Sequence, residues 1–150
     1  MSGIIGGAGS KSGVIGPPPA FSASATVPSP NSYITFQTKY VDTHNCFDTS
    51  NGIYTAPITG NYYVAFKYNI RGYVTTYIRI DNVSFLQHQT NTAYTSTTSP
   101  DVWESMHYGG VVEVKAGQTI RCYMAAFAEH PAWDSGVWNM FSGHYIGMAN

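Results

Sequence analysis

The chain has 150 residues, of which 10% are charged and 15% are aromatic, and its formal net charge is −1. A balance this close to neutral gives no excess of Lys and Arg to neutralise phosphates, which argues against nucleic-acid binding. No apolar run approaches the ~18 residues of a membrane-spanning helix, and the N-terminus lacks the pattern of a secretory signal. We therefore expect no membrane insertion, and the low charge and abundant Tyr are typical of an all-β surface protein.

Residues 1–16 differ in composition from the rest of the chain and predict a Gly-rich N-terminal arm. Six of them are Gly, but the glycines do not keep the strict period of three, with intervening Pro, that a collagen triple helix needs. We expect either a disordered leader or an arm that folds only against a partner. Residues 17–19 form a stiff polyproline spacer. The candidate anchors of a tether are Ile4, Ile5, Val14 and Ile15.

The segment of residues 20–150 predicts one β domain, because short alternating segments are separated by Gly, Pro and Asn. The expected strands in chain order are residues 20–25, 33–40, 55–59, 60–70, 73–80, 83–89, 103–115, 119–127 and 140–148. No segment shows a long helical period. Many short strands with turn signals between them are typical of a β-sandwich or jelly roll.

Two of these strands show which side chains share a face. In strand 60–70, the two-residue period of a β-strand gathers the apolar side chains of Tyr62, Val64, Phe66, Tyr68 and Ile70. In strand 119–127, Ile120, Cys122 and Met124 share a face, which favours a buried free thiol at Cys122. A disulfide between Cys122 and Cys46 stays open as the alternative.

Turn residues and glycines predict local features of the other strands. Asp81-Asn82 predicts a tight hairpin turn. Gly109-Gly110 interrupts strand 103–115 and predicts a β-bulge. In strand 33–40, the alternation places Tyr40 on the same face as Phe36.

The stretch of residues 36–66 repeats aromatic residues, an Asp and a Gly at spacings that resemble the signature of the C1q/TNF-like jelly-roll domain. Val64 departs from it, since the family usually has Phe there. The resemblance covers roughly residues 19–149 and implies a ten-stranded jelly-roll sandwich that forms a homotrimer, with the closing strand packed centrally. The signature positions are Phe36, Asp42, Phe47, Tyr54, Gly60, Tyr62 and Phe66, with Phe141 and Gly143 in the closing strand.

The residues that could carry chemistry form no known catalytic pattern. The five His are scattered, and neither an HExxH pair nor a GxSxG nucleophile elbow occurs. We therefore expect no enzyme activity and no catalytic residue. His144 is interpreted as a packed, hydrogen-bonded side chain in the closing strand.

A bound metal is not required by the sequence, and we expect no cofactor. Some C1q-like trimers hold Ca²⁺ on or near their axis, and Ca²⁺ prefers hard oxygen ligands. By resemblance, the weak candidates for such a site are Asp42, Asp48, Asp81 and Asp134.

Aromatic residues in two loops, 90–101 and 129–139, predict a binding patch. Flat aromatic faces with a polar rim suit sugar rings or a protein receptor. The candidate receptor- or glycan-binding residues are Trp133, His130, Asp134 and Tyr94. The alternative is that the Trp residues are core, with Trp103 and Trp138 beginning strands.

The expected function combines the arm with the domain. Residues 1–16 resemble the N-termini of structural proteins of marine bacteriophages. This resemblance implies a virion protein, in which a trimeric C1q-like knob is tethered to other virion proteins by its arm. The knob would bind a host cell-surface glycan or protein as the tip of a tail fibre, or decorate the capsid, and would be extracellular after release. The alternatives are a cellular C1q-like soluble recognition or signalling ligand, and a carbohydrate-active enzyme on a jelly roll.

Overall fold

A computed structural model describes residues 16–25, 29–70, 73–91, 104–128 and 139–148. Within these ranges the chain forms eleven β-strands and no helix that could cross a membrane. The strands are β1 (Ala20–Ala25), β2 (Ser32–Tyr33), β3 (Phe36–Asp42), β4 (Phe47–Asp48), β5 (Ile53–Thr55), β6 (Gly60–Ile70), β7 (Tyr73–Ile80), β8 (Val83–Asn91), β9 (Glu104–Val114), β10 (Thr119–Ala128) and β11 (Met140–Gly147).

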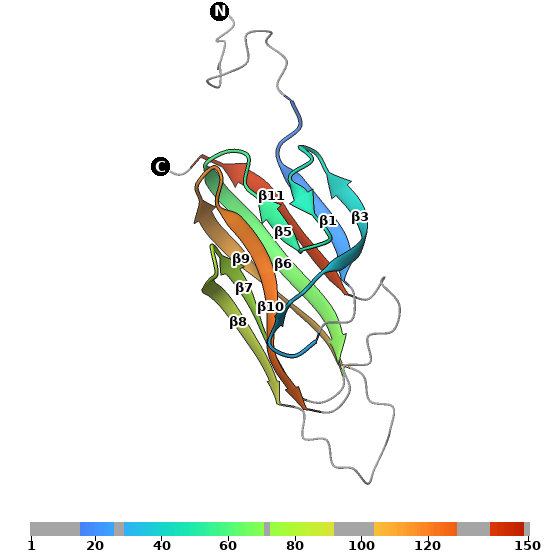
Figure 1. The fold of residues 1–150 in the computed structure, drawn as a ribbon. Helices are drawn as coiled ribbons and strands as arrows, with labels where there is room; N and C mark the ends of the chain where they lie inside the picture. The colour runs from blue at the N-terminus through green and yellow to red at the C-terminus, as the bar shows by residue number, and fades with distance from the viewer. Residues whose placement is uncertain (1–15, 26–28, 71–72, 92–103, 129–138, 149–150) are drawn as a thin grey trace, which may run out of the picture.

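The strands form two antiparallel sheets that face each other as layers (Figure 1). Sheet A has the order β3-β1-β11-β6-β9, and sheet B has the order β4-β5-β10-β7-β8 with β2 added beside β10. The closing strand β11 therefore lies in the centre of sheet A, as the resemblance implied. The expected all-β jelly roll is confirmed, with eleven strands in place of ten.

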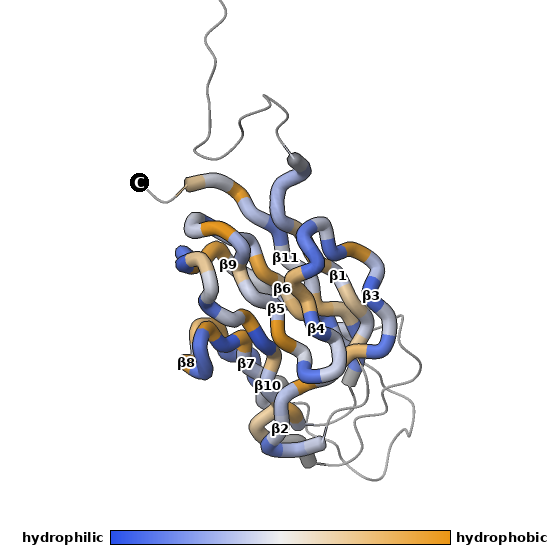
Figure 2. The backbone as a smooth tube through the Cα atoms, turned by 45° about the horizontal axis from the view of Figure 1, so that its top comes forward, coloured by the Kyte–Doolittle hydropathy of each residue, from blue (hydrophilic) through white to orange (hydrophobic). Residues whose placement is uncertain are grey.

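Hydrophobic and hydrophilic residues alternate along the strands (Figure 2), so that each sheet turns one apolar face inward. The inward residues of β6 and β10 are the predicted ones, and all are 0% exposed: Tyr62, Val64, Phe66, Tyr68, Ile120, Cys122 and Met124. Both cysteines are free thiols, so no disulfide joins Cys46 to Cys122. Neither of them therefore links the two sheets covalently.

Signature aromatics from both sheets meet in one cluster at the middle of the core. The Phe21 ring stacks on that of Tyr54 with 4.1 Å between centroids, and Phe141 meets Phe21 edge-on at 4.9 Å. Phe36 and Phe47 complete the cluster at 5.2 Å from each other. Such ring pairs add to the burial of apolar area, so the signature spacing specifies packing between the two sheets.

Two strand predictions between residues 33 and 60 are wrong in detail. The expected strand 33–40 divides into β2, which joins sheet B, and β3, which joins sheet A. Tyr40 is 50% exposed, because β3 is an edge strand of sheet A and its alternation is interrupted by register shifts against β1. The short strand expected at 55–59 ends at Thr55 as β5.

The bulge predicted at Gly109-Gly110 is also wrong. Strand β9 pairs with β6 without a register shift from Gly60↔Val114 to Ile70↔Glu104. The glycines serve close packing instead, since a Cβ on Gly109 would lie 2.9 Å from the hydroxyl oxygen of Tyr63. The Tyr63 side chain therefore crosses β9 on the outer face of sheet A.

The hairpin predicted at Asp81-Asn82 is confirmed and joins β7 to β8. Both residues have positive φ, 47° and 69°, as a two-residue turn that follows the twist of the strands requires. The Asp81 carboxylate accepts hydrogen bonds from the backbone N–H and hydroxyl of Thr119 and from the Gln118 amide. This turn is thereby fixed to the start of β10.

Candidate recognition surfaces

Two groups of predicted site residues lie outside the described residues. The first is the receptor-binding patch of Trp133, His130, Asp134 and Tyr94, and the second is the tether formed by Ile4, Ile5, Val14 and Ile15. Trp103 and Trp138 lie outside them as well. Both groups stay predictions.

The three described calcium candidates lie at the end of β3 (Asp42), at the end of β4 (Asp48) and in the β7–β8 turn (Asp81), and they do not form one cluster. Asp42 forms a salt bridge with Lys39 at 2.8 Å and accepts hydrogen bonds from the backbone N–H groups of Cys46 and Phe47. Asp48 caps the turn that follows β4, and Asp81 holds the β7–β8 turn. Within the described ranges, no three His, Cys, Asp or Glu side chains gather as a metal site would need.

Hydrogen bonding to these carboxylates lowers their pKa values. At Asp42, burial raises the pKa, but the hydrogen bond from Lys39, the backbone N–H groups and the lysine charge outweigh it. At Asp81, the backbone N–H of Thr119 is the largest cause of the lowered pKa. All of these carboxylates are therefore ionised at neutral pH, and their role in the structure is to close turns.

The polyproline spacer lies against sheet A at its β11 side. Pro19 is buried, and its carbonyl accepts the backbone N–H of Tyr145 at 2.8 Å. The Pro18 carbonyl accepts the Thr43 hydroxyl at 3.0 Å. These bonds fix where the chain enters the domain, while the predicted boundary at residue 16 stays a prediction.

Two neighbouring rows on the outer face of sheet A carry no charged side chain, while Lys67 and Glu113 lie elsewhere on that face. One row across all five strands is formed by small or apolar side chains, namely Val41, Ser22, Ser142, Ala65 and Gly109. The next row consists of Ala20, His144, Tyr63 and Val111. Neither row contains an acid, a lysine or an arginine.

Two large apolar side chains on this side of sheet A are exposed to solvent: Val111 is 56% and Ile146 is 52% exposed. Met148, which follows the end of β11, is 73% exposed. His144, which the sequence predicted to be packed, is exposed and meets the ring of Tyr63 at 5.7 Å. The prediction failed because the face of His144, which also carries Met140, points away from the core, whereas Phe141 and Gly143 on the other face are buried.

The outer face of sheet B is different in character, because it carries two arginines among tyrosines. Arg79 in β7 and Arg121 in β10 are direct cross-strand partners. The guanidinium carbon of Arg79 lies 3.7 Å from the ring centroid of Tyr123, and that of Arg121 lies 3.5 Å from the centroid of Tyr33. We call Arg79, Arg121, Tyr33, Tyr77 and Tyr123 the arginine–tyrosine cluster.

Sequence reasoning missed this cluster, although the alternation contained a signal. Arg121 and Tyr123 occupy the positions of β10 between the apolar Ile120, Cys122 and Met124. Outward charge is the default for such positions, so neither residue stands out alone. Only the register of β10 against β7 and β2 brings the five side chains together.

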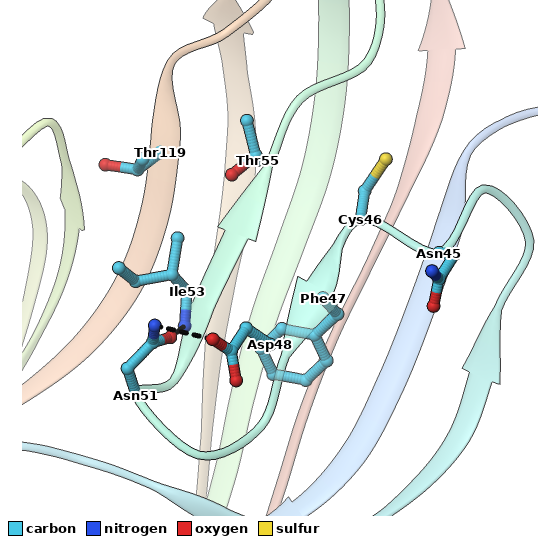
Figure 3. Close-up of a pocket in the computed structure, with 8 residues that line it drawn as sticks. All are labelled: Asn45, Cys46, Phe47, Asp48, Asn51, Ile53, Thr55 and Thr119. Atoms are coloured by element: carbon cyan, nitrogen blue, oxygen red, sulfur yellow. Dashed lines mark hydrogen bonds between the residues drawn. The ribbon is translucent and has the colours of Figure 1, made fainter.

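A shallow hollow of about 660 Å³ adjoins the cluster on the same face of sheet B. It is lined by Asn45, Cys46, Phe47, Asp48, Asn51, Ile53, Thr55 and Thr119 (Figure 3). The Asn51 amide donates to the Asp48 carboxylate at 2.7 Å, and the Asn51 carbonyl accepts Nη2 of Arg121 at 2.8 Å. Arg121 therefore lies at the rim of a polar hollow.

Comparison with known proteins agrees with this architecture. A family model described as the C1q domain matches residues 20–146. Solved structures match in 224 chains, among them the globular domain of zebrafish complement 1qA protein. That domain has a TM-score of 0.67 and 22% sequence identity, and the match covers 87% of this chain and 99% of that one. No curated protein matches. Because the family model spans most of its length, the chain belongs to the C1q domain family.

Proposed function

We propose that this protein is a non-enzymatic, homotrimeric recognition module that associates through the outer face of sheet A. C1q domains generally form trimers and bind ligands, and the family is one of recognition domains without enzymatic activity. The observation that carries the proposal is the outer face of sheet A, where two uncharged rows include the exposed Val111 and adjoin the exposed Ile146.

The physical reason is the cost of leaving this face in water. Exposed apolar patches on a soluble protein mark interaction sites, and closed symmetric association removes them without open-ended growth. The row from Val41 to Gly109 is flat because its side chains are small, which lets a neighbouring subunit approach the strands closely. An uncharged contact also avoids burying unpaired ions.

The test compares two valines that differ in the sheet on which they lie. Val111 is on the outer face of sheet A, and Val83, which is 71% exposed, begins β8 in sheet B. We expect wild type and Val83→Glu to sediment at micromolar concentration as three chains of 16.3 kDa. Val111→Glu should sediment as a smaller species, because three carboxylates would enter the contact.

Two results would contradict the proposal. If the wild-type protein is a monomer at micromolar concentration, the proposed trimer is refuted. If a folded Val111→Glu protein stays trimeric, the subunit contact does not involve the outer face of sheet A. Circular dichroism of both variants separates loss of association from loss of folding.

The second part of the proposal is that the protein is part of a phage virion, and residues 1–16 support this location. Their likeness to phage structural proteins favours a virion, in which the arm tethers the knob through Ile4, Ile5, Val14 and Ile15. The knob would then serve host attachment at a fibre tip or decorate the capsid. C1q domain proteins are typically extracellular, which agrees equally with a cellular soluble ligand.

Deleting residues 1–16 tests the tether. We expect the wild-type protein in purified phage particles by mass spectrometry, and the truncated protein in the unbound fraction. Equal incorporation of both forms would remove the tether. Absence of the protein from particles, together with its release by the producing cells, would favour the cellular ligand.

A further inference from the structure

The arginine–tyrosine cluster opposes two like charges across a strand pair. Arg121 and Arg79 are directly opposite in the β10–β7 register, on the outer face. Like charges at directly opposite positions destabilise a sheet. Uncharged β-branched residues would serve the sheet better at such positions, so stability alone does not account for this pair.

Stacking against tyrosine holds both guanidinium groups in place. Arg121 lies over Tyr33 and Arg79 lies over Tyr123, while the Arg79 guanidinium carbon is also 5.4 Å from the centroid of Tyr77. The two rings nearest the arginines, Tyr33 and Tyr123, meet edge-on at 5.1 Å. Cation–π contacts of this kind fix the plane of a guanidinium and leave its edge free for hydrogen bonds.

Strand β2 positions Tyr33 in this cluster. It is two residues long and joins sheet B only through β10. Its Tyr33 donates its hydroxyl proton to the side-chain oxygen of Asn82 at 2.6 Å. The ring of Tyr33 is thereby held over Arg121 from both ends, by backbone pairing and by the turn between β7 and β8.

Among the described residues, most N–H groups of the two arginines have no hydrogen-bond partner. Each guanidinium has five N–H donors, and the described contacts use Nη2 of Arg121 with the Asn51 carbonyl and Nη1 of Arg79 with the Tyr33 hydroxyl at 3.4 Å. The Nε atoms of both are buried without a partner. Within the described ranges, the one salt bridge is that of Lys39 with Asp42, in sheet A.

The acids that border the cluster are occupied by other groups. Asp81 accepts from Gln118 and Thr119, and Asp48 accepts from Ser50 and Asn51. Among the described residues, no carboxylate pairs with either arginine, so the two guanidinium groups form a preorganised pair of forks. Such forks match the oxygens of a carboxylate or a sulfate.

We propose that the arginine–tyrosine cluster and the adjoining hollow form a binding site for an acidic saccharide. Its oxyanion, a carboxylate or a sulfate, binds the free Nη–H groups of Arg79 and Arg121. Its neutral hydroxyls enter the hollow, where Asp48, Asn51 and Thr119 supply acceptors and donors. The Asp48 carboxylate repels a second anion, so the ligand binds in one orientation.

This inference rests on the recognition role proposed above and names its ligand class. All of the site residues come from one chain, so binding does not require the trimer. The outer face of sheet B also faces away from the contact proposed for sheet A. The site would therefore be available on every subunit of a trimer, and three such sites would give avidity to a polymer.

The test measures binding per chain with small probes, by calorimetry and saturation-transfer NMR on the full-length protein. The probes are trigalacturonate for a carboxylate, galactose 6-sulfate for a sulfate, and maltotriose as the neutral sugar. We expect wild type to bind at least one acidic probe and not maltotriose, with weaker binding at higher salt. The acidic probe that binds identifies the oxyanion.

Four variants then assign the site. Arg79→Gln and Arg121→Gln should each weaken binding at least tenfold. Arg121→Lys keeps the charge but loses the planar fork, so its binding should fall between those of wild type and Arg121→Gln. The matched control is Lys115→Gln, which removes one positive charge at an exposed residue of the β9–β10 turn and should bind like wild type.

Three outcomes would overturn the proposal. These are failure of wild type to bind either acidic probe, unchanged binding in both arginine-to-glutamine variants, and equal weakening in Lys115→Gln, which would show an effect of net charge alone. Thermal melts check that every variant is folded. A monomeric protein that binds one probe per chain keeps this site and removes the trimer, whereas a trimer without binding removes only the site.

Discussion

Gly143 tests how closely the core is packed around the closing strand β11. It lies in β11, opposite Phe21 of β1 and Val64 of β6. A Cβ added at Gly143 would lie 2.6 Å from Cε1 and 2.8 Å from Cζ of Phe21, and 2.9 Å from the Tyr63 carbonyl oxygen. Real Cβ atoms essentially never approach so closely. Gly143→Ala therefore has to displace either a core ring or a strand.

Neither the Phe21 ring nor the Tyr63 carbonyl can move without a loss of stability. The Phe21 ring is buried and stacked at 4.1 Å on Tyr54, with Phe47 at 5.2 Å, and the Tyr63 carbonyl belongs to the centre of sheet A. Overpacking of this kind costs about 1–3 kcal/mol, while the less flexible unfolded chain of the alanine variant returns about 0.4–1 kcal/mol. We expect a net loss of about 1–2 kcal/mol, or about 2–8 °C in Tm.

The matched control is Gly147→Ala on the same strand, where an added Cβ meets nothing within 4 Å. Its free energy of unfolding should stay within about 0.5 kcal/mol of wild type. Urea denaturation of the three proteins at one protein concentration measures both values, since association makes apparent stability depend on concentration. Equal midpoints for the two alanine variants would refute the packing argument.

Two further predictions concern titratable groups. Burial raises the pKa of the Cys122 thiol, and burial together with the Asp42 charge raises that of Cys46. Iodoacetamide should therefore label the half-buried Cys46 slowly in the native protein, and it should label Cys122 only in denaturant. Mass spectrometry measures both rates, and labelling of native Cys122 at the rate of Cys46 would contradict this prediction. Asp42→Asn should lower the free energy of unfolding at pH 7 by about 1–3 kcal/mol. Because folding lowers the pKa of Asp42, its contribution is present above its unfolded pKa of about 4 and is lost as the pH falls through the folded pKa. The difference from wild type, measured by urea denaturation, should shrink below pH ~4, and a constant difference down to pH ~2 would be incompatible with this assignment.

The fold could be predicted from the sequence because its information is local. In β6, a two-residue period places Tyr62, Val64 and Phe66 on one face whatever strand lies beside them, and all three are fully buried. The departure from the family signature at Val64 did not affect the strand prediction. Val64 is a smaller apolar side chain than Phe, and it is still buried in a strand that pairs on both sides. The prediction from the aromatic spacings was correct for the same reason. The spacing places each aromatic residue at an inward position of its own strand, and these residues pack together in the core.

What the sequence could not supply was the direction of each face and the register between strands. Strict alternation would place Ile146 and Met148 on the same face as His144, and this apolar face was interpreted as the inner one. The inner face of β11 is instead defined by Phe141 and Gly143. The alternation along β11 alone therefore does not say which of its two faces the core covers.

The arginine–tyrosine cluster shows the same limit for a binding site. Arg79 and Arg121 are far apart in the chain, and each is an ordinary outward residue of its own strand. Only seven Lys and Arg occur in the whole sequence, which makes the placement of two of them opposite each other informative once the register is known. The β10–β7 pairing creates a local repulsion that the tyrosines partly offset. A binding anion would offset the remainder, because its charge neutralises the pair that the sheet itself leaves unbalanced. The two outer faces therefore differ in character: sheet A carries two rows without an acid, a lysine or an arginine, whereas sheet B carries the Arg79–Arg121 pair.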